Sequence, residues 1–148
     1  MLTSLKVIDH IHTDTKIIDE ISLSYEDRFI RRKKLTANNG TEFLVNLEET
    51  KSVDENYYFK LDSGEAIKVI SKEENLIQIT GDNIKQIIWH IGNRHLPCQI
   101  EESRILIQED SVIKEMIIKL GGNVTNVVEK FKPEGGAYGM GRTHSHQH

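Results

Sequence analysis

The feature that most constrains the fold is a single change in the spacing of apolar residues, at the polar run 71–75. Before this run, short segments rich in β-branched and aromatic residues alternate with turn sequences such as Ala37-Asn38-Asn39-Gly40. This pattern predicts strands joined by hairpins. The predicted strands are 5–8, 16–23, 29–35, 42–47, 57–61 and 65–70. Short, evenly spaced strands favour a small sandwich or barrel-like domain, so we expect an all-β domain at residues 1–73.

Beyond the polar run, strands are expected to alternate with helices. Residues 76–80 predict a strand. A helix follows, because Asp82 resembles an N-cap and isoleucines recur at positions 84, 87, 88 and 91. Gly92 and Asn93 predict the end of this helix, since both tolerate a left-handed backbone. We expect Trp89 to pack between this helix and the sheet.

Two more strands are predicted at 98–101 and 104–108, and a second helix begins at Asp110 and closes at Gly121-Gly122. The apolar residues expected to face inward from this helix are Val112, Ile113, Met116, Ile117 and Leu120, and 124–131 is the last predicted strand. The resulting order, βαββαβ, predicts a ferredoxin-like domain at residues 74–132, with two helices on one face of an antiparallel sheet. The predicted fold class is therefore α+β.

Composition excludes several classes of function. The formal net charge of −4 and the isoelectric point near 6.0 give no reason to expect nucleic acid or an anionic membrane as a partner. The strands of the second domain also lack the aromatic residues with which RNA-binding domains stack bases. No apolar run approaches the ~20 residues of a membrane helix, and a single cysteine suits a reducing compartment. With no nucleophile elbow, phosphate loop or HExxH motif, we expect a cytoplasmic binding protein and not an enzyme.

The chain ends in a glycine-rich segment, residues 133–148, with His144, His146 and His148 at alternate positions. Little in it is apolar, so we expect this tail to be flexible. Imidazole suits Ni, Cu and Zn, and alternate histidines can bring several nitrogens to one ion. Ordering each tail residue costs about 1–2 kcal/mol of backbone entropy, so such a site should release metal readily, which suits transfer. A solvated tail without a role is the alternative.

A second candidate ligand lies in the folded part, within the sequence WHIGNRHLPCQI. His95 falls in the connection between the first predicted helix and the next strand, where Pro97 stiffens the backbone. A lone exposed histidine is ordinarily a surface residue. In a twofold dimer with His95 near the axis, the two copies would supply two ligands and leave positions for the tails. Two weak features would then form one metal site.

Two stretches, IGNRHLP at residues 91–97 and the ending GAYGMGRTHSH, resemble the UreE family of urease accessory proteins, which are nickel metallochaperones. The resemblance covers nearly the whole chain, including the order of the two domains. It implies a homodimer in which His95 binds nickel and the tail histidines His144 and His146 contribute; we add His148 to this set. It also implies delivery of Ni(II) to apo-urease through the urease GTPase and its accessory complex. The N-terminal domain would correspond to the family's peptide-binding-like domain.

Other candidate ligands stay open. His90 lies beside the apolar stripe of the first helix, Cys98 forms an H-x-x-C pair with His95, and His10 and His12 form an H-x-H pair. Each is more often a packing or surface residue. The sequence does not separate nickel delivery from the alternative, a cytoplasmic Ni or Zn buffer or metal sensor, because both need the same ligands. Zn(II) and Cu(II) suit these ligands too, and Cu²⁺ stands above Ni²⁺ in the Irving–Williams order.

Overall fold

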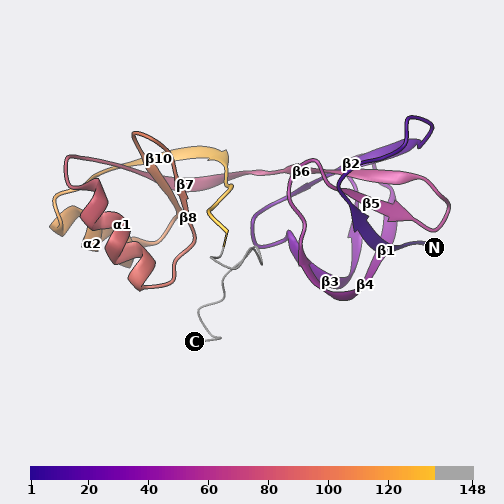
Figure 1. The fold of residues 1–148 in the computed structure, drawn as a ribbon, viewed down its shortest axis with the longest axis horizontal. Helices are drawn as coiled ribbons and strands as arrows, with labels where there is room; N and C mark the ends of the chain where they lie inside the picture. The colour runs from indigo at the N-terminus through magenta and orange to yellow at the C-terminus, as the bar shows by residue number, and fades with distance from the viewer. Residues whose placement is uncertain (136–148) are drawn as a thin grey trace. The chain divides into compact units, whose positions relative to one another are not determined.

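The protein is described by a computed structural model that covers residues 1–135. They form two compact units, Met1–Lys72 and a second unit that begins at Glu73. Strands dominate both units, and the two helices of the described residues lie in the second (Figure 1). The predicted α+β class is therefore confirmed.

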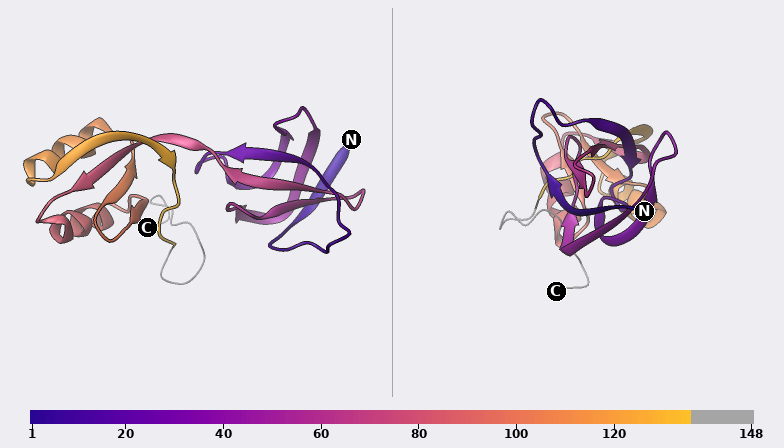
Figure 2. Two further views of the ribbon diagram at one scale, coloured as in Figure 1. Left: turned by 90° about the horizontal axis from the view of Figure 1, so that it is seen from above. Right: turned by 90° about the vertical axis from the view of Figure 1, so that its right-hand side faces the viewer.

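The first unit is a six-stranded sheet that curls around its own core (Figure 2). Its strands are β1 (Leu2–Ile8), β2 (Ile17–Leu23), β3 (Phe29–Thr36), β4 (Glu42–Ser52), β5 (Tyr58–Leu61) and β6 (Ala66–Ser71). Their order is β2-β6-β5-β1-β4-β3. The β1–β4 and β2–β6 pairs are parallel, and the other pairs are antiparallel. All six predicted strands are present. β1 begins earlier and β4 ends later than predicted, because polar residues continue both ladders.

The core of the first unit is built by the alternation of inward and outward residues along these strands. Two phenylalanines on β4 and β5, Phe43 and Phe59, are fully buried, and their ring centroids lie 5.4 Å apart. The other buried members are aliphatic: Ile21, Leu23, Ile30, Leu35, Ala37, Val45, Leu47, Val53, Leu61, Ile67 and Val69. This cluster contains no residue of the second unit.

Asp19 on β2 is a buried carboxylate to which the sequence analysis gave no role. It accepts hydrogen bonds from the backbone amides of Glu20, Asn39 and Thr41 at 2.7–3.3 Å, and from the Asn39 side chain at 3.0 Å. Burial alone would raise the pKa of Asp19, but hydrogen bonds from Thr41 and from the amides of Glu20 and Asn39 lower it overall. The carboxylate therefore fixes the predicted turn at 37–41, where Gly40 has a left-handed φ of 94°.

The second unit is a four-stranded antiparallel sheet with both helices on one face (Figures 1 and 2). Its elements are β7 (Glu73–Thr80), α1 (Ile84–Asn93), β8 (Cys98–Ile100), β9 (Ile105–Gln108), α2 (Ser111–Lys119) and β10 (Asn123–Lys130). The strand order is β10-β7-β9-β8. The predicted strand 76–80 begins instead at Glu73, because the polar residues 73–75 pair with the end of β10.

Isoleucines from both helices and the two central strands form the core of this unit: Ile77, Ile79, Ile87, Ile91, Ile105, Ile107, Ile113 and Ile117. One side chain from each helix packs against Gly122, just before β10. A Cβ atom at this position would lie 2.7 Å from the side chains of both Ile117 and Ile87. Any larger residue would push these side chains apart, which explains the glycine.

The helix ends agree only partly with the sequence. The second helix was predicted to begin at Asp110, and Asp110 is its N-cap, because its side chain accepts hydrogen bonds from the amides of Val112 and Ile113 at 2.9 and 3.1 Å. Gly121 closes α2 with a left-handed φ of 89°. The N-cap of α1 is Asn83 and not Asp82, and the Asn83 side chain donates to the carbonyl of Leu120 instead of capping its own helix.

Two predictions of inward-facing residues were wrong. Trp89 on α1 is 64% exposed, and Val112 on α2 is 74% exposed. Each helix buries one narrow stripe against the sheet, with Ile87 and Ile91 on α1 and Ile113 on α2 among the buried residues. Residues 89 and 112 lie outside these stripes, so the helices present apolar side chains to solvent.

Candidate metal centre

His95 lies in the tight turn that follows α1. The amides of Arg94 and His95 donate to the carbonyls of Ile91 and Gly92 at 3.1 and 3.0 Å. The φ of His95 is 57°, in the left-handed region, which costs a non-glycine residue about 1–2 kcal/mol. The sequence had placed this conformation at Gly92 or Asn93. A left-handed residue just after the last turn is a common way for a helix to end, and such conformations also cluster at functional sites. The turn leaves the His95 residue exposed.

An exposed aromatic surface precedes this turn on α1. The Trp89 and His90 rings meet edge to face, with centroids 5.0 Å apart and planes at 89°. The Arg94 guanidinium donates from Nη1 to the His90 carbonyl at 3.3 Å, which ties the turn to the last part of the helix. Large exposed aromatic side chains are typical of protein contact surfaces. The surface formed by Trp89 and His90 is therefore a candidate contact beside His95.

Cys98 begins β8, three residues after His95, and its side chain packs against the core of the second unit. Burial, and then the nearby Glu134 carboxylate, raise the pKa of the thiol. At neutral pH the thiol therefore stays protonated, whereas the thiolate is the form that binds metal. This geometry favours a packing role for Cys98.

The residues that lead to the tail, 131–135, are called the root segment below. Phe131 is fully buried. The amide of Lys132 donates to Oε1 of Gln99 at 2.8 Å, and the amide of Glu134 donates to the carbonyl of Cys98 at 2.8 Å. Both acceptors lie on β8, the strand that follows the His95 turn. The chain therefore enters the tail beside the strand that His95 precedes.

The described residues gather no complete metal site. Within residues 1–135, no group of three or more His, Cys, Asp or Glu side chains is placed to hold an ion. His144, His146 and His148 lie outside the described residues. His10 contacts Asp9, with Nδ1 and Oδ1 2.7 Å apart, and both side chains are largely exposed, as is His12. His95 is thus the one predicted ligand that the structure describes.

Comparison with known proteins decides the family. The model of the N-terminal domain of UreE urease accessory proteins matches residues 3–71, and that of their C-terminal domain matches residues 74–148. The chain belongs to the UreE family. A urease accessory protein UreE from Ruegeria pomeroyi is 50% identical over 130 residues, covering 88% of this chain and 87% of the relative. Relatives of the same name from Rhodobacter capsulatus and Azorhizobium caulinodans are 47% and 37% identical, covering 88% and 100% of this chain and 83% and 76% of their own length.

Membership of the UreE family agrees with the resemblance seen in the sequence. Neither matching family model describes an enzyme; both describe an accessory protein. No helix among residues 1–135 has the length and apolar character needed to cross a membrane. The boundary between the two family models falls where the contacts of the chain divide, between Lys72 and Glu73.

The sequence of this UreE chain gave no sign of one cluster in the second unit, the ion pairs of Arg104. This side chain bonds to Glu129 and Glu101, which are 25 and 3 residues away in sequence. Only the 3-residue spacing to Glu101 was visible in the sequence as a possible local pair. The partnership with Glu129 depends on the strand order, so no sequence spacing signals it.

Proposed function

We propose that this protein is a nickel metallochaperone that delivers Ni(II) to apo-urease during assembly of the urease active site. The observation that carries the proposal is the display of His95 in a strained, exposed turn of a UreE family member. Strain is retained where a function requires it, and imidazole is a good ligand for Ni(II). We further propose that the protein acts in the cytoplasm and catalyses no reaction of its own.

The metal site requires two copies of the chain. One His95 supplies one nitrogen, whereas a homodimer with the two His95 turns near its twofold axis supplies two from the same residue. The exposed Trp89 beside this turn supports an interface here, because aromatic side chains are enriched in protein contacts. His144, His146 and His148 then complete the coordination from the tails. Because three tail histidines are available, the ion can exchange one ligand at a time.

The length of the tail supports this ligand set. The root segment is bonded to Cys98, three residues from His95, and His144 follows Glu134 by ten residues. An extended chain spans about 3.3–3.6 Å per residue, so a tail of this length reaches about 33–36 Å. Such a reach exceeds the extended length of the chain from His95 to Cys98, which are three positions apart. The tail histidines can therefore meet the His95 imidazole without any rearrangement of the fold.

We propose three functional parts: residues 1–73 as the peptide-binding-like domain, 74–132 as a ferredoxin-like domain for metal binding and dimerisation, and 133–148 as a flexible tail. The partners are the urease GTPase and the urease apoprotein with its accessory complex, and not nucleic acid or a membrane. Zn(II) and Cu(II) suit the same ligands, and Cu²⁺ outranks Ni²⁺ in affinity. Metal supply and partner recognition would therefore select nickel in the cell.

Urease activation tests delivery directly. Apo-urease, its GTPase and the other accessory proteins are incubated with this protein carrying about one Ni(II) per dimer, in the presence of a chelator that removes free nickel. We expect urease activity to appear with the unaltered protein and to be largely lost with His95→Ala. A His10→Ala variant is the matched control and should activate fully. The alternative, a metal buffer or sensor, would bind nickel equally well yet give no activation and no metal-dependent complex with the GTPase.

A further inference from the structure

The root segment follows β10, at the edge of the sheet opposite to β8, the strand that His95 precedes. β10 and β8 form opposite edges of the sheet, because the strand order is β10-β7-β9-β8. Strands lie about 4.8 Å apart, so three spacings separate these edges by about 14 Å. The tail follows β10, whereas His95 precedes β8. A tail that left directly from Lys130 would start at the edge away from His95.

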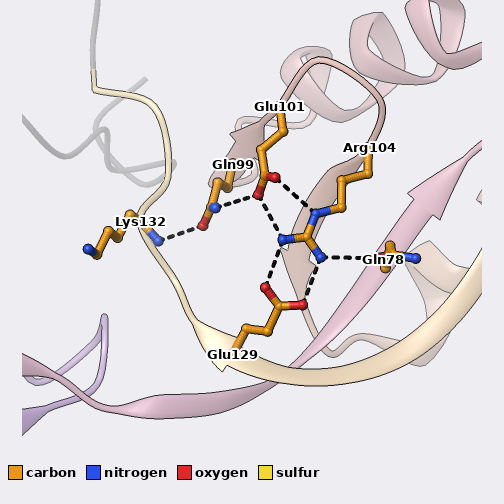
Figure 3. Close-up of polar contacts among 6 residues, drawn as sticks. All are labelled: Gln78, Gln99, Glu101, Arg104, Glu129 and Lys132. Atoms are coloured by element: carbon orange, nitrogen blue, oxygen red, sulfur yellow. Dashed lines mark hydrogen bonds and ion pairs between the residues drawn. The ribbon is translucent and has the colours of Figure 1, made fainter.

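The root segment crosses this gap and is held at its far side. The amide of Lys132 donates to the Gln99 side chain (Figure 3). The amide of Glu134 donates to the carbonyl of Cys98, and both acceptors lie on β8. Phe131, at the start of the crossing, is fully buried. Together these contacts move the point at which the tail leaves the fold from one edge of the sheet to the other.

Gln99 is itself held by a network on the face of the sheet away from the helices. Gln99, Gln78 and Arg104 each lie next to residues that pack on the helical side, so strand alternation directs them to the opposite face. Nε2 of Gln99 donates to Oε2 of Glu101 at 2.8 Å. This same oxygen also accepts from Nη2 of Arg104 at 3.1 Å (Figure 3).

The network determines which end of the Gln99 amide faces the root segment. An ionised carboxylate accepts hydrogen bonds and does not donate, so Glu101 must face the NH₂ group of Gln99. The carbonyl oxygen is then left to accept the amide of Lys132. Arg104 fixes the Glu101 carboxylate, and it also forms a two-bond pair with Glu129, at 2.7 Å for each bond. Oε1 of Gln78 also accepts from Nη1 of Arg104, at 2.9 Å.

We propose that Gln99, oriented by Glu101 and Arg104, is a positioning residue that anchors the root segment beside the His95 turn and so raises the local concentration of the tail histidines at the metal. This inference rests on the proposed function. Tethering turns the binding of a second ligand into an intramolecular event, whose strength depends on the length and origin of the tether. The anchor shortens the tether and moves its origin toward His95.

The expected size of the effect follows from chain statistics. His144 follows Glu134 by ten residues and Lys130 by fourteen, and the root-mean-square length of flexible chains in general rises from about 17 to about 21 Å between these two lengths. Releasing the root segment also moves the origin of the tether back by about 14 Å. The two changes together lower the local concentration of tail imidazole by about three- to tenfold.

The test is a comparison of Ni(II) affinity in two backgrounds, the full chain and a chain that ends at Arg142 and lacks the three tail histidines. The variant Gln99→Ala with Glu134→Pro removes the acceptor of one anchor and the amide donor of the other. We expect it to weaken Ni(II) binding by about three- to tenfold in the full chain, and to leave the affinity of the shortened chain unchanged. Gln78→Ala and Glu134→Ala are the matched controls, since both keep the anchors, and both should bind nickel as the unaltered chain does.

Each other outcome has a distinct meaning. Equal weakening in both backgrounds would show a general structural effect and overturn the positioning role. The anchor variant could instead leave the Ni(II) affinity of the full chain unchanged, although the unaltered shortened chain binds more weakly than the unaltered full chain. That result would overturn this inference alone and leave the proposed metal site intact. Equal affinity of the unaltered full and shortened chains would remove the tail from the metal site, and with it both this inference and the tail's part in the proposed function.

Discussion

The two units of this protein use their polar residues in different ways. In the first unit the buried Asp19 carboxylate accepts bonds from three backbone amides and pins a turn between strands. In the second unit, His95 sits exposed on a left-handed backbone. Asp19 has used its bonding capacity within the fold, whereas no group of three or more potential metal ligands that includes His95 is found among residues 1–135. One polar residue supports the fold from a buried position, and the other is exposed to solvent.

The cores follow the same division, because each hydrophobic cluster contains residues of one unit only. Loss of packing in one unit should therefore leave the other folded. This separation is testable. Changes to the core of the first unit should lower the stability of that unit and leave metal binding by the second unit unchanged. The variants below are chosen to break or sharpen this separation, starting with the largest expected effect.

Replacing Phe43 with Ala should destabilise the first unit and spare the second. Phe43 is fully buried against Phe59, and removal of a buried phenylalanine side chain costs about 3–5 kcal/mol. Hydrogen exchange measured by mass spectrometry in increasing urea should show early loss of protection in β4 and β5. Protection in β7 and β9, and nickel affinity, should stay as they are. Simultaneous loss of protection in both units would mean that they unfold as one, contrary to this account.

Replacing Asp19 with Asn should destabilise the first unit to a smaller extent, by about 1–3 kcal/mol, because buried amides lose a charged acceptor. The hydrogen bonds hold the pKa of Asp19 below its usual range. A lowered pKa in the folded state stabilises the fold above the unfolded value of about 3.9 and loses this contribution as the pH falls through the folded value. Urea unfolding of the unaltered protein should show that the free energy of unfolding of the first unit falls as the pH is lowered through this range.

The matching control for that experiment is the pH profile of Asp19→Asn itself. Its stability should be lower near neutral pH and fall less steeply in acid than that of the unaltered protein. If the stability of Asp19→Asn instead follows the pH profile of the unaltered protein at a constant offset, another group causes the acid sensitivity.

The exposed histidines of the first unit should have the smallest effect. His10 contacts Asp9 and His12 is exposed, and no third ligand lies with them among residues 1–135. The double variant His10→Ala/His12→Ala should keep nickel affinity within about twofold by calorimetry, a change of less than about 0.4 kcal/mol. A larger loss would place a metal ligand in the first unit and remove the contrast between the units.

The sequence predicted those elements that apolar periodicity defines. The order of strands and helices after residue 75 followed from isoleucine spacing, and the start of the second helix at Asp110 was recognised because the signal is local. The start of β7 at Glu73 was missed because its first residues are polar and are held by pairing with β10. Trp89 was misplaced because periodicity identifies the buried stripe of a helix but not its width.

The sequence supplied candidate ligands for the metal site, which stay predictions, but not the geometry of the residues around His95. His95 was identified from its place in the connection after the first helix, while its left-handed φ was assigned to neighbours with a stronger preference for it. The bonds of Gln99 to Lys132, and of Arg104 to Glu129, join residues that are 33 and 25 positions apart in sequence. Such contacts depend on which strands are neighbours, information that spacing along the chain does not contain.

The most direct test of the central claim is the stoichiometry and affinity of Ni(II) binding at pH 8, measured by calorimetry on the unaltered protein and on His95→Ala. His12→Ala, at an exposed histidine of the first unit, is the matched control. Loss of residues that merely support a metal ligand costs about 10–100-fold in affinity, so loss of His95 from both copies should weaken the tight site by at least about 100-fold. We expect the unaltered protein to bind about one ion per dimer at this site. Tight binding by His95→Ala equal to that of the unaltered protein would contradict the account, because the histidine tail would then bind nickel without the His95 turn.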